Sequence, residues 1–271
     1  MPSTAAAPEL PGFTLDTFEH GGSTFPVYRT GTGPAVIVIH EIPGITPKVA
    51  AFGTRVAAEG FSAVLPSLFG QPGRDMSGRY VVSSLVHGCV SREFANWATR
   101  TTSPVTVWLR ALARAEHARC GGPGVGAVGM CFTGGFALAM MVDEEMVAPV
   151  LSQPSLPFPI GKKWKRDLGI SDADLAIVKA RAAAGQCLLG LRFTGDKAVP
   201  EARFQRLRDE LGDRFLAVEI DSSPDNGFGI RKAAHSVLTE DLVDEPGHPT
   251  RDALDQVLSF YKERLQPAER Q

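Results

Sequence analysis

The chain has 271 residues, and its 28 Lys and Arg against 30 Asp and Glu give a formal net charge of −2. Apolar residues make up 44% of the chain and charged residues 21%, which are proportions of a globular protein and exclude an intrinsically disordered chain. The near-neutral charge provides no basic surface for a polyanion, so we expect no nucleic-acid partner.

The first third of the chain predicts strands before helices. Residues 13–18 and 25–29 flank the Gly21-Gly22 pair and are predicted to form an antiparallel hairpin. The β-branched run at residues 36–39 is typical of a central strand that is buried on both faces. Helical spacing of apolar residues follows at 47–59, and an apolar strand is predicted at 61–65.

Residues 66–91 are rich in Gly, Ser and Arg, and their pattern assigns no element. Beyond them, strands and helices alternate to the end of the chain. Helices are predicted at 105–117, 132–142, 172–184, 202–211 and 251–265, and strands at 124–130, 147–151, 187–194 and 215–220. This alternation predicts an α/β fold with a mainly parallel sheet and helices on both faces, in which functional sites form beyond the carboxyl ends of the strands.

Domain organisation and location follow from composition. We expect a flexible leader at residues 1–12, one domain at 13–265 and a tail at 266–271. The sequence shows neither the basic and apolar regions of a secretory signal nor an apolar run of about 18 residues, so we expect no membrane association. The four cysteines, Cys89, Cys120, Cys131 and Cys187, are too sparse for a disulfide scaffold and favour the reducing cytoplasm.

The segment Gly129-Met130-Cys131-Phe132-Thr133 lies between a predicted strand and a predicted helix. It resembles the Gly-x-Ser-x-Gly turn that exposes a nucleophile, with Cys in place of Ser. A thiol at a helix N-terminus would be favoured as the thiolate, and the N–H of Phe132 would face a developing oxyanion. Thr133 stands where the motif has Gly. The alternative is a buried cysteine that acts as a small apolar side chain.

Two partners for the thiol are expected further along the chain. Asp196 follows the predicted strand at 187–194 and is the first acid after Cys131 to stand at a strand end, although an Asp there can also cap a turn. His235 and His248 are the histidines that follow it. We favour His235 because it lies in the loop after the last predicted strand, whereas His248 lies in a Pro- and Gly-containing turn at a helix entrance.

A polar pair, His40-Glu41, ends the strand at 36–39. Because side chains alternate along a strand, the two cannot both face the cleft if the strand stays regular. We expect Glu41 to face the cleft and His40 to be a buried histidine with satisfied hydrogen bonds. The N–H of Ile42 would then supply the second oxyanion donor.

Taken together, four motifs resemble the dienelactone hydrolase family, the carboxymethylenebutenolidase-like branch of the α/β-hydrolases. They occur in the family's order across residues 13–265 and read Val-Ile-Val-Ile-His-Glu-Ile-Pro-Gly-Ile, Gly-Met-Cys-Phe-Thr-Gly-Gly, Gly-Asp-x-x-Val-Pro and Ala-His-Ser. The resemblance implies an α/β-hydrolase fold and a small lactone or ester as substrate, with no metal or organic cofactor.

The resemblance also implies roles for single residues. Cys131 would be the nucleophile, His235 the general base, Asp196 its orienting acid, and Glu41 the residue that contacts the thiol and controls its ionisation. Family members open a lactone ring through thiolate attack and an acyl-enzyme, which agrees with the need of a thiol for an adjacent base.

Several features leave alternatives open. The stretch at 152–186 is extended relative to the family, and its basic run at 162–166 is typical of a solvated loop, with a cap over the site or an anion-steering patch as alternatives. Arginines that could hold a substrate carboxylate are Arg74, Arg79, Arg92 and Arg231. A non-catalytic, ligand-binding relative remains a second hypothesis. A redox-sensing thiol ranks last because the sequence has no CxxC pair.

Overall fold

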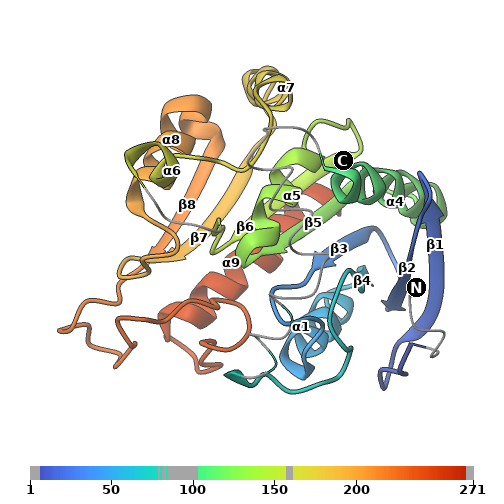
Figure 1. Cartoon of the computed structure of the whole chain (residues 1–271), viewed down its shortest axis with the longest axis horizontal. Helices are drawn as coiled ribbons and strands as arrows, with labels where there is room; N and C mark the ends of the chain where they lie inside the picture. The colour runs from blue at the N-terminus through green and yellow to red at the C-terminus, as the bar shows by residue number, and fades with distance from the viewer. Residues whose placement is uncertain (1–6, 79, 81–83, 85–102, 157–160, 267–271) are drawn as a thin grey trace, which may run out of the picture.

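The computed structural model describes residues 7–78, 80, 84, 103–156 and 161–266. Within these residues an eight-stranded sheet runs through the molecule in the order β1-β2-β4-β3-β5-β6-β7-β8 (Figure 1). The strands are β1 (Thr14–His20), β2 (Ser23–Thr30), β3 (Ala35–Ile39), β4 (Ser62–Pro66), β5 (Val125–Met130), β6 (Met146–Ser152), β7 (Leu188–Phe193) and β8 (Phe215–Ile220).

The predicted hairpin and the predicted parallel sheet are both confirmed. β1 pairs with β2 in antiparallel register, with His20 opposite Ser23 on either side of the Gly21-Gly22 turn. β2 is also antiparallel to β4, while all pairs from β4 through β3 to β8 are parallel. The carboxyl ends of these parallel strands therefore meet at one edge of the sheet.

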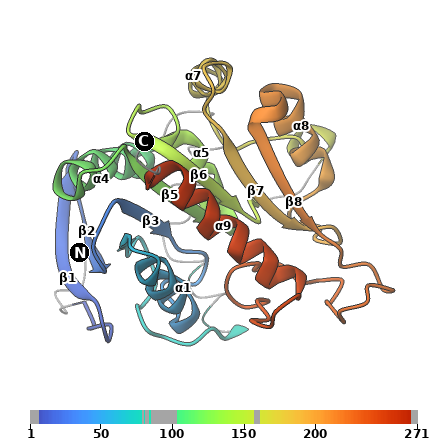
Figure 2. The same cartoon turned by 180° about the vertical axis from the view of Figure 1, so that it is seen from behind.

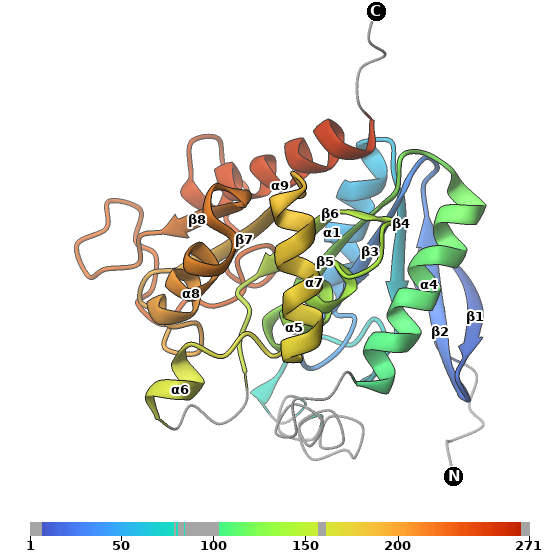
Figure 3. The same cartoon turned by 90° about the horizontal axis from the view of Figure 1, so that it is seen from above.

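Helices cover both faces of the sheet (Figures 2 and 3). The described helices of four or more residues are α1 (Pro47–Ala58), α4 (Pro104–Cys120), α5 (Gly134–Met140), α6 (Lys162–Lys165), α7 (Asp172–Ala183), α8 (Glu201–Leu211) and α9 (Pro249–Leu265). α1 and α9 bury their apolar side chains with one core, and α4, α5, α7 and α8 with the other. This is the α/β-hydrolase fold that the sequence predicts.

The side chains of β3 show how the strand supports both cores. Val36 and Val38 pack with α1 and α9, and Ile37 and Ile39 pack with α4 and α5. All four are fully buried, as the continuous β-branched run predicts, because helices cover both faces of a central parallel strand. None of the described helices is long and apolar enough to cross a membrane.

Two segments differ from what the sequence predicts. The helix expected at 132–142 is shorter, since a 3₁₀ turn (η1, Cys131–Thr133) precedes α5. The leader expected at 1–12 lies outside the described residues up to position 6, and beyond it the chain is anchored. Leu10 is buried in the core beside α1, and the Tyr28 hydroxyl donates a 2.6 Å hydrogen bond to the Pro8 carbonyl. These two contacts join the segment to the rest of the domain.

The end of the domain is also anchored. Gln266, the first residue of the expected tail, donates from its side-chain amide to the carbonyls of Glu59 and Gly60. Residues 267–271 of that tail lie outside the described residues, as do Cys89, Arg79 and Arg92. The described arginines among the candidates for a substrate carboxylate are therefore Arg74 and Arg231.

Candidate active site

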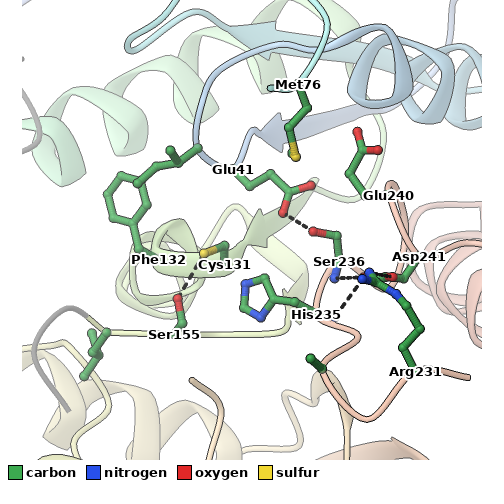
Figure 4. A pocket seen from close by; sticks show the side chains of 13 residues that line it. Glu41, Met76, Cys131, Phe132, Ser155, Arg231, His235, Ser236, Glu240 and Asp241 are labelled. Atoms are coloured by element: carbon green, nitrogen blue, oxygen red, sulfur yellow. Dashed lines mark hydrogen bonds and ion pairs between the residues drawn. The ribbon is translucent and has the colours of Figure 1, made fainter. Parts of the chain in front are cut away.

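A pocket of about 430 Å³ opens at the carboxyl edge of the sheet (Figure 4). Its lining comes from segments that follow successive parallel strands: Glu41 after β3, Cys131 after β5, Ser155 after β6 and His235 after β8. Asp196 follows β7. It does not line the pocket itself but is hydrogen-bonded to His235, which does. The fold thus brings together Cys131, Asp196, His235 and Glu41, which are separated by long stretches of sequence.

Cys131 lies at a sharp turn between β5 and η1. Its backbone φ is 58°, in the left-handed region that residues other than Gly seldom adopt. Gly129 makes the turn possible, because a Cβ at this position would lie 2.2 Å from the carbonyl oxygen of Thr133. A strained, partly exposed residue at a strand-to-helix turn agrees with the nucleophile turn that the sequence predicts.

Thr133, the departure from the motif, fits without displacing the turn. Its hydroxyl accepts the N–H of Met130 at 2.8 Å and lies within donor distance of the Ile39 carbonyl at 3.0 Å. The side chain therefore ties the turn to the end of β3. The close approach that the motif assigns to a glycine occurs one residue later, because a Cβ at Gly134 would lie 2.7 Å from the Cβ of Pro154.

His235 is bonded to Asp196, as the sequence predicts. The Nδ1 atom of His235 lies 2.6 Å from Oδ2 of Asp196, and only 7% of the Asp196 side chain is exposed. Burial alone lowers the pKa of His235, but the charge of Cys131 and hydrogen bonds to Asp196 and Cys131 raise it to about 11. The imidazole therefore interacts with both of its predicted partners. His248 has a different role, since its Nδ1 accepts from Thr250 at the start of α9.

The backbone of the histidine loop is held by an acid that sequence analysis did not identify. Oδ2 of Asp241 accepts the N–H groups of His235 and Ser236, at 2.8 and 3.1 Å. The other oxygen of Asp241 pairs with Arg231 at 2.5 Å. Although burial raises the pKa of Asp241, these hydrogen bonds lower it overall. Arg231 lies on the pocket lining, but its guanidinium is already paired with this acid.

Glu41 faces the pocket side of β3 but contacts other residues than expected. Glu41 is 2% exposed, and its carboxylate accepts hydrogen bonds from Ser236 at 2.7 Å, from Gln153 at 3.2 Å and from Thr239. In the described part of the chain the thiol of Cys131 hydrogen-bonds to Ser155 and not to Glu41. The contact between Glu41 and the thiol is thus not formed here, because three donors already hold the carboxylate.

His40 is the satisfied, buried histidine that the sequence analysis favoured. Its Nε2 accepts the N–H of Leu68 at 3.1 Å, and its Nδ1 lies 3.0 Å from the Glu41 carbonyl. The first bond requires an unprotonated Nε2, so the proton lies on Nδ1. Burial lowers the pKa of His40 to about 4, which keeps the ring neutral. The two side chains of the His40-Glu41 pair therefore have separate environments, as alternation predicts.

Besides Asp241, three residues of the site were missed by sequence analysis. Gln153 is fully buried with a φ of 38°, and its side chain bridges Glu41 and the N–H of Val237. Ser155 contacts the thiol, and Arg203 holds the chain around Ser155. Burial lowers the pKa of Arg203 to about 10. A positive φ cannot be read from one sequence, and these three contacts join residues 24 to 112 positions apart.

A prediction follows from the burial of Glu41. Burial raises the pKa of this carboxyl above its unfolded value, so its ionisation destabilises the folded protein at neutral pH. We expect Glu41→Gln to raise the melting temperature by roughly 2–4 °C at pH 7, for a gain of about 1 kcal/mol. The hydroxyls of Ser236 and Thr239 can rotate to accept the new amide. Thermal unfolding between pH 4 and 8 measures this.

The pH dependence fixes the sign of that effect. At a pH below the ordinary pKa of Glu, about 4.3, the carboxyl is protonated in both the folded and the unfolded protein. The stability gained from the amide should then vanish. It should grow as the pH rises. Burial would not be the dominant influence on the pKa of Glu41 if the Glu41→Gln variant were less stable than the parent at pH 7. The same conclusion would follow if the variant exceeded the parent in stability by the same amount at pH 4 as at pH 7.

Comparison with known proteins identifies the family of the chain. The model of the dienelactone hydrolase family matches residues 24–265. The chain belongs to the dienelactone hydrolase family. The curated hydrolase fragment YghX of Escherichia coli K12 is 40% identical over 58 residues, which are 20% of this chain and 50% of that relative. The match thus spans about half of the length of that relative.

Solved structures share the fold at low identity. One is a protein from Klebsiella pneumoniae assigned as a dienelactone hydrolase, with 18% identity, a TM-score of 0.62, and coverage of 93% of this chain and 98% of that one. The dienelactone hydrolase-like promiscuous phosphotriesterase P91, from metagenomic libraries, has 17% identity and a TM-score of 0.60 over 92% and 97% of the two chains. Esterase 2 of Thermogutta terrifontis has 16% identity and a TM-score of 0.57 over 94% and 96%. The family match supports a hydrolase, and the solved structures show the shared fold.

Proposed function

We propose that the chain hydrolyses small carboxylic esters or lactones through an acyl-enzyme on Cys131. The observation that carries this proposal is the assembly in one pocket of a cysteine at a strained turn and a histidine bonded at 2.6 Å to a buried carboxylate. The cytoplasm is the proposed location, since a reducing compartment keeps such a thiol free. The proposed partner is a small-molecule ester or lactone.

The proposed reaction starts when His235 takes the proton of the Cys131 thiol, and the raised pKa of His235 favours keeping that proton on the imidazole. In the first step the Cys131 thiolate attacks the substrate carbonyl carbon, and the carbonyl electrons move to oxygen. The pocket-lining residues Ile42 and Phe132 would donate their N–H groups to this oxyanion. The intermediate then collapses to a thioester, and the leaving oxygen takes the proton of His235.

The second step needs His235 as a base. The charge of Cys131 is one of the influences that raise the pKa of this histidine, and acylation removes that charge. The imidazole can then take a proton from water while the water oxygen attacks the thioester carbon. Collapse of this second intermediate releases the acid and restores the thiolate. Asp196 holds Nδ1 throughout, so that the opposite nitrogen faces the reacting atoms.

Trapping the acyl-enzyme tests the proposal. An aryl ester of a small acid is mixed with the enzyme, the reaction is stopped by acid within one turnover, and peptides are analysed by mass spectrometry. We expect the mass of the acyl group on the Cys131 peptide and release of the phenol in a burst. Hydrolysis with the acyl group on a different residue would contradict the assigned nucleophile. A non-catalytic, ligand-binding role would give neither hydrolysis nor acylation.

A further inference from the structure

The Ser155 hydroxyl and the Cys131 sulfur lie 3.0 Å apart and face each other in the pocket (Figure 4). We propose that Ser155 is a further catalytic residue, whose hydroxyl hydrogen-bonds to the reacting sulfur, and that Arg203 is a positioning residue that holds it there. This inference rests on the proposed role of Cys131 as the nucleophile. It also gives a function to part of the extended stretch at 152–186.

A hydroxyl suits both states of the sulfur. It donates its hydrogen to a thiolate and accepts one from a thiol. Because donation to the charged form favours that form, the hydroxyl increases the fraction of Cys131 present as thiolate. In the second step it stabilises the thiolate as the bond between sulfur and the acyl carbon breaks. The proton stays on the Ser155 oxygen in every step, so His235 remains the group that transfers protons.

The position of Ser155 is fixed by the turn that carries the thiol. The N–H of Ser155 donates to the carbonyl of Cys131 at 3.0 Å, so the two residues share a backbone and a side-chain contact. Ser155 itself is 7% exposed. The preceding Pro154 packs against Gly134, where a Cβ would be 2.7 Å from the proline. The absence of a side chain at Gly134 lets the segment reach the sulfur.

Arg203 holds the same segment from the other side. This arginine of α8 is 2% exposed, and its guanidinium donates to four main-chain carbonyls. These belong to Pro154 at 2.8 Å, Trp164 at 3.3 Å, Asp167 at 2.7 Å and Ala198 at 3.1 Å. One buried side chain therefore joins the residue before Ser155, the stretch around α6, and the loop that carries Asp196.

The test compares Ser155→Ala with Ser155→Thr, which retains a hydroxyl. The readout is the rate at which iodoacetamide alkylates Cys131 between pH 5 and 10, followed by mass spectrometry, with Cys131→Ala as the blank. We expect the midpoint of this profile to rise by about one pH unit in Ser155→Ala, with kcat/KM at pH 7 lower by about tenfold, because one hydrogen bond to a charged group is lost. Ser155→Thr should restore both. An unchanged midpoint in Ser155→Ala would overturn the proposal.

A second pair of variants tests the positioning residue. Arg203→Met should raise the alkylation midpoint in the same direction as Ser155→Ala. The matched control is Arg181→Met. Arg181 of α7 also donates to main-chain carbonyls, those of Met141 and Glu144 among them, but these carbonyls are not next to Ser155, whereas Arg203 donates to the carbonyl of Pro154. Equal shifts in the two arginine variants would overturn the role of Arg203. The comparison of Ser155→Ala with Ser155→Thr stands whatever the arginine variants show, because neither substitution of Ser155 removes a buried charge.

The two proposals fail in different ways. Full esterase activity in Cys131→Ala would refute the proposed nucleophile, and with it the role of Ser155. An inactive Cys131→Ala together with an unchanged Ser155→Ala would refute the role of Ser155 alone.

Discussion

Replacement of Cys131 by alanine is expected to lower kcat/KM for small aryl esters by about 10⁴-fold or more. The methyl group cannot attack a carbonyl, so the remaining rate comes from binding and from the oxyanion donors alone. Steady-state hydrolysis of aryl acetate and butyrate esters by variant and parent measures the loss. Such a loss would identify the Cys131 sulfur as the nucleophile, because the substitution removes only the sulfur from the pocket.

Cys187→Ala provides the matched control for this loss. Cys187 is 6% exposed and precedes the first residue of β7, at the opposite edge of the sheet from the pocket. It therefore tests whether loss of a buried thiol alone reduces activity through stability. Parent-like hydrolysis by Cys131→Ala, or an equal loss in Cys187→Ala, would contradict the proposed nucleophile.

Asp196→Asn is expected to have the next largest effect, a loss of kcat of about 10²- to 10⁴-fold. The carboxylate accepts from Nδ1 of His235, whereas an amide can present its NH₂ group to that nitrogen and favour the wrong tautomer. The substitution also removes one of the groups that raise the pKa of His235, which weakens its pairing with the thiolate. The dependence of kcat on pH measures both effects.

Asp221→Asn is the control for this variant. Asp221 follows β8 at the same edge of the sheet, where it accepts from Ser223. A loss confined to KM in Asp196→Asn, or a similar loss of kcat in the control, would argue against orientation of His235 as the role of Asp196.

The sequence predicted the elements that depend on local pattern. The β-branched run of β3, the hairpin at Gly21-Gly22, and the polar residues that follow the strands can all be read from neighbouring positions. Cys131, Asp196 and His235 were predicted as site residues for this reason, because each stands directly after a strand or in the loop that follows one.

Contacts between distant segments could not be predicted in the same way. Ser155 follows a Pro-containing stretch without periodicity, and its importance depends on a contact with Cys131 across the pocket. Arg203 belongs to a charged, amphipathic helix in which it resembles its exposed neighbours. The helix after Cys131 was predicted too long because its first turn follows a residue with positive φ, a conformation that side-chain pattern does not encode.

The burial of Glu41 also has a consequence for refolding. Its hydrogen-bond donors Ser236 and Thr239 lie 195 and 198 positions further along the chain. Contacts between residues so far apart in the sequence are expected to form late in folding, after local helices and hairpins. When the denatured protein is diluted from urea, enzymatic turnover should therefore return after the far-ultraviolet circular dichroism signal. The carboxylate stays hydrated until the last third of the chain covers it, which makes regained activity a measure of complete folding.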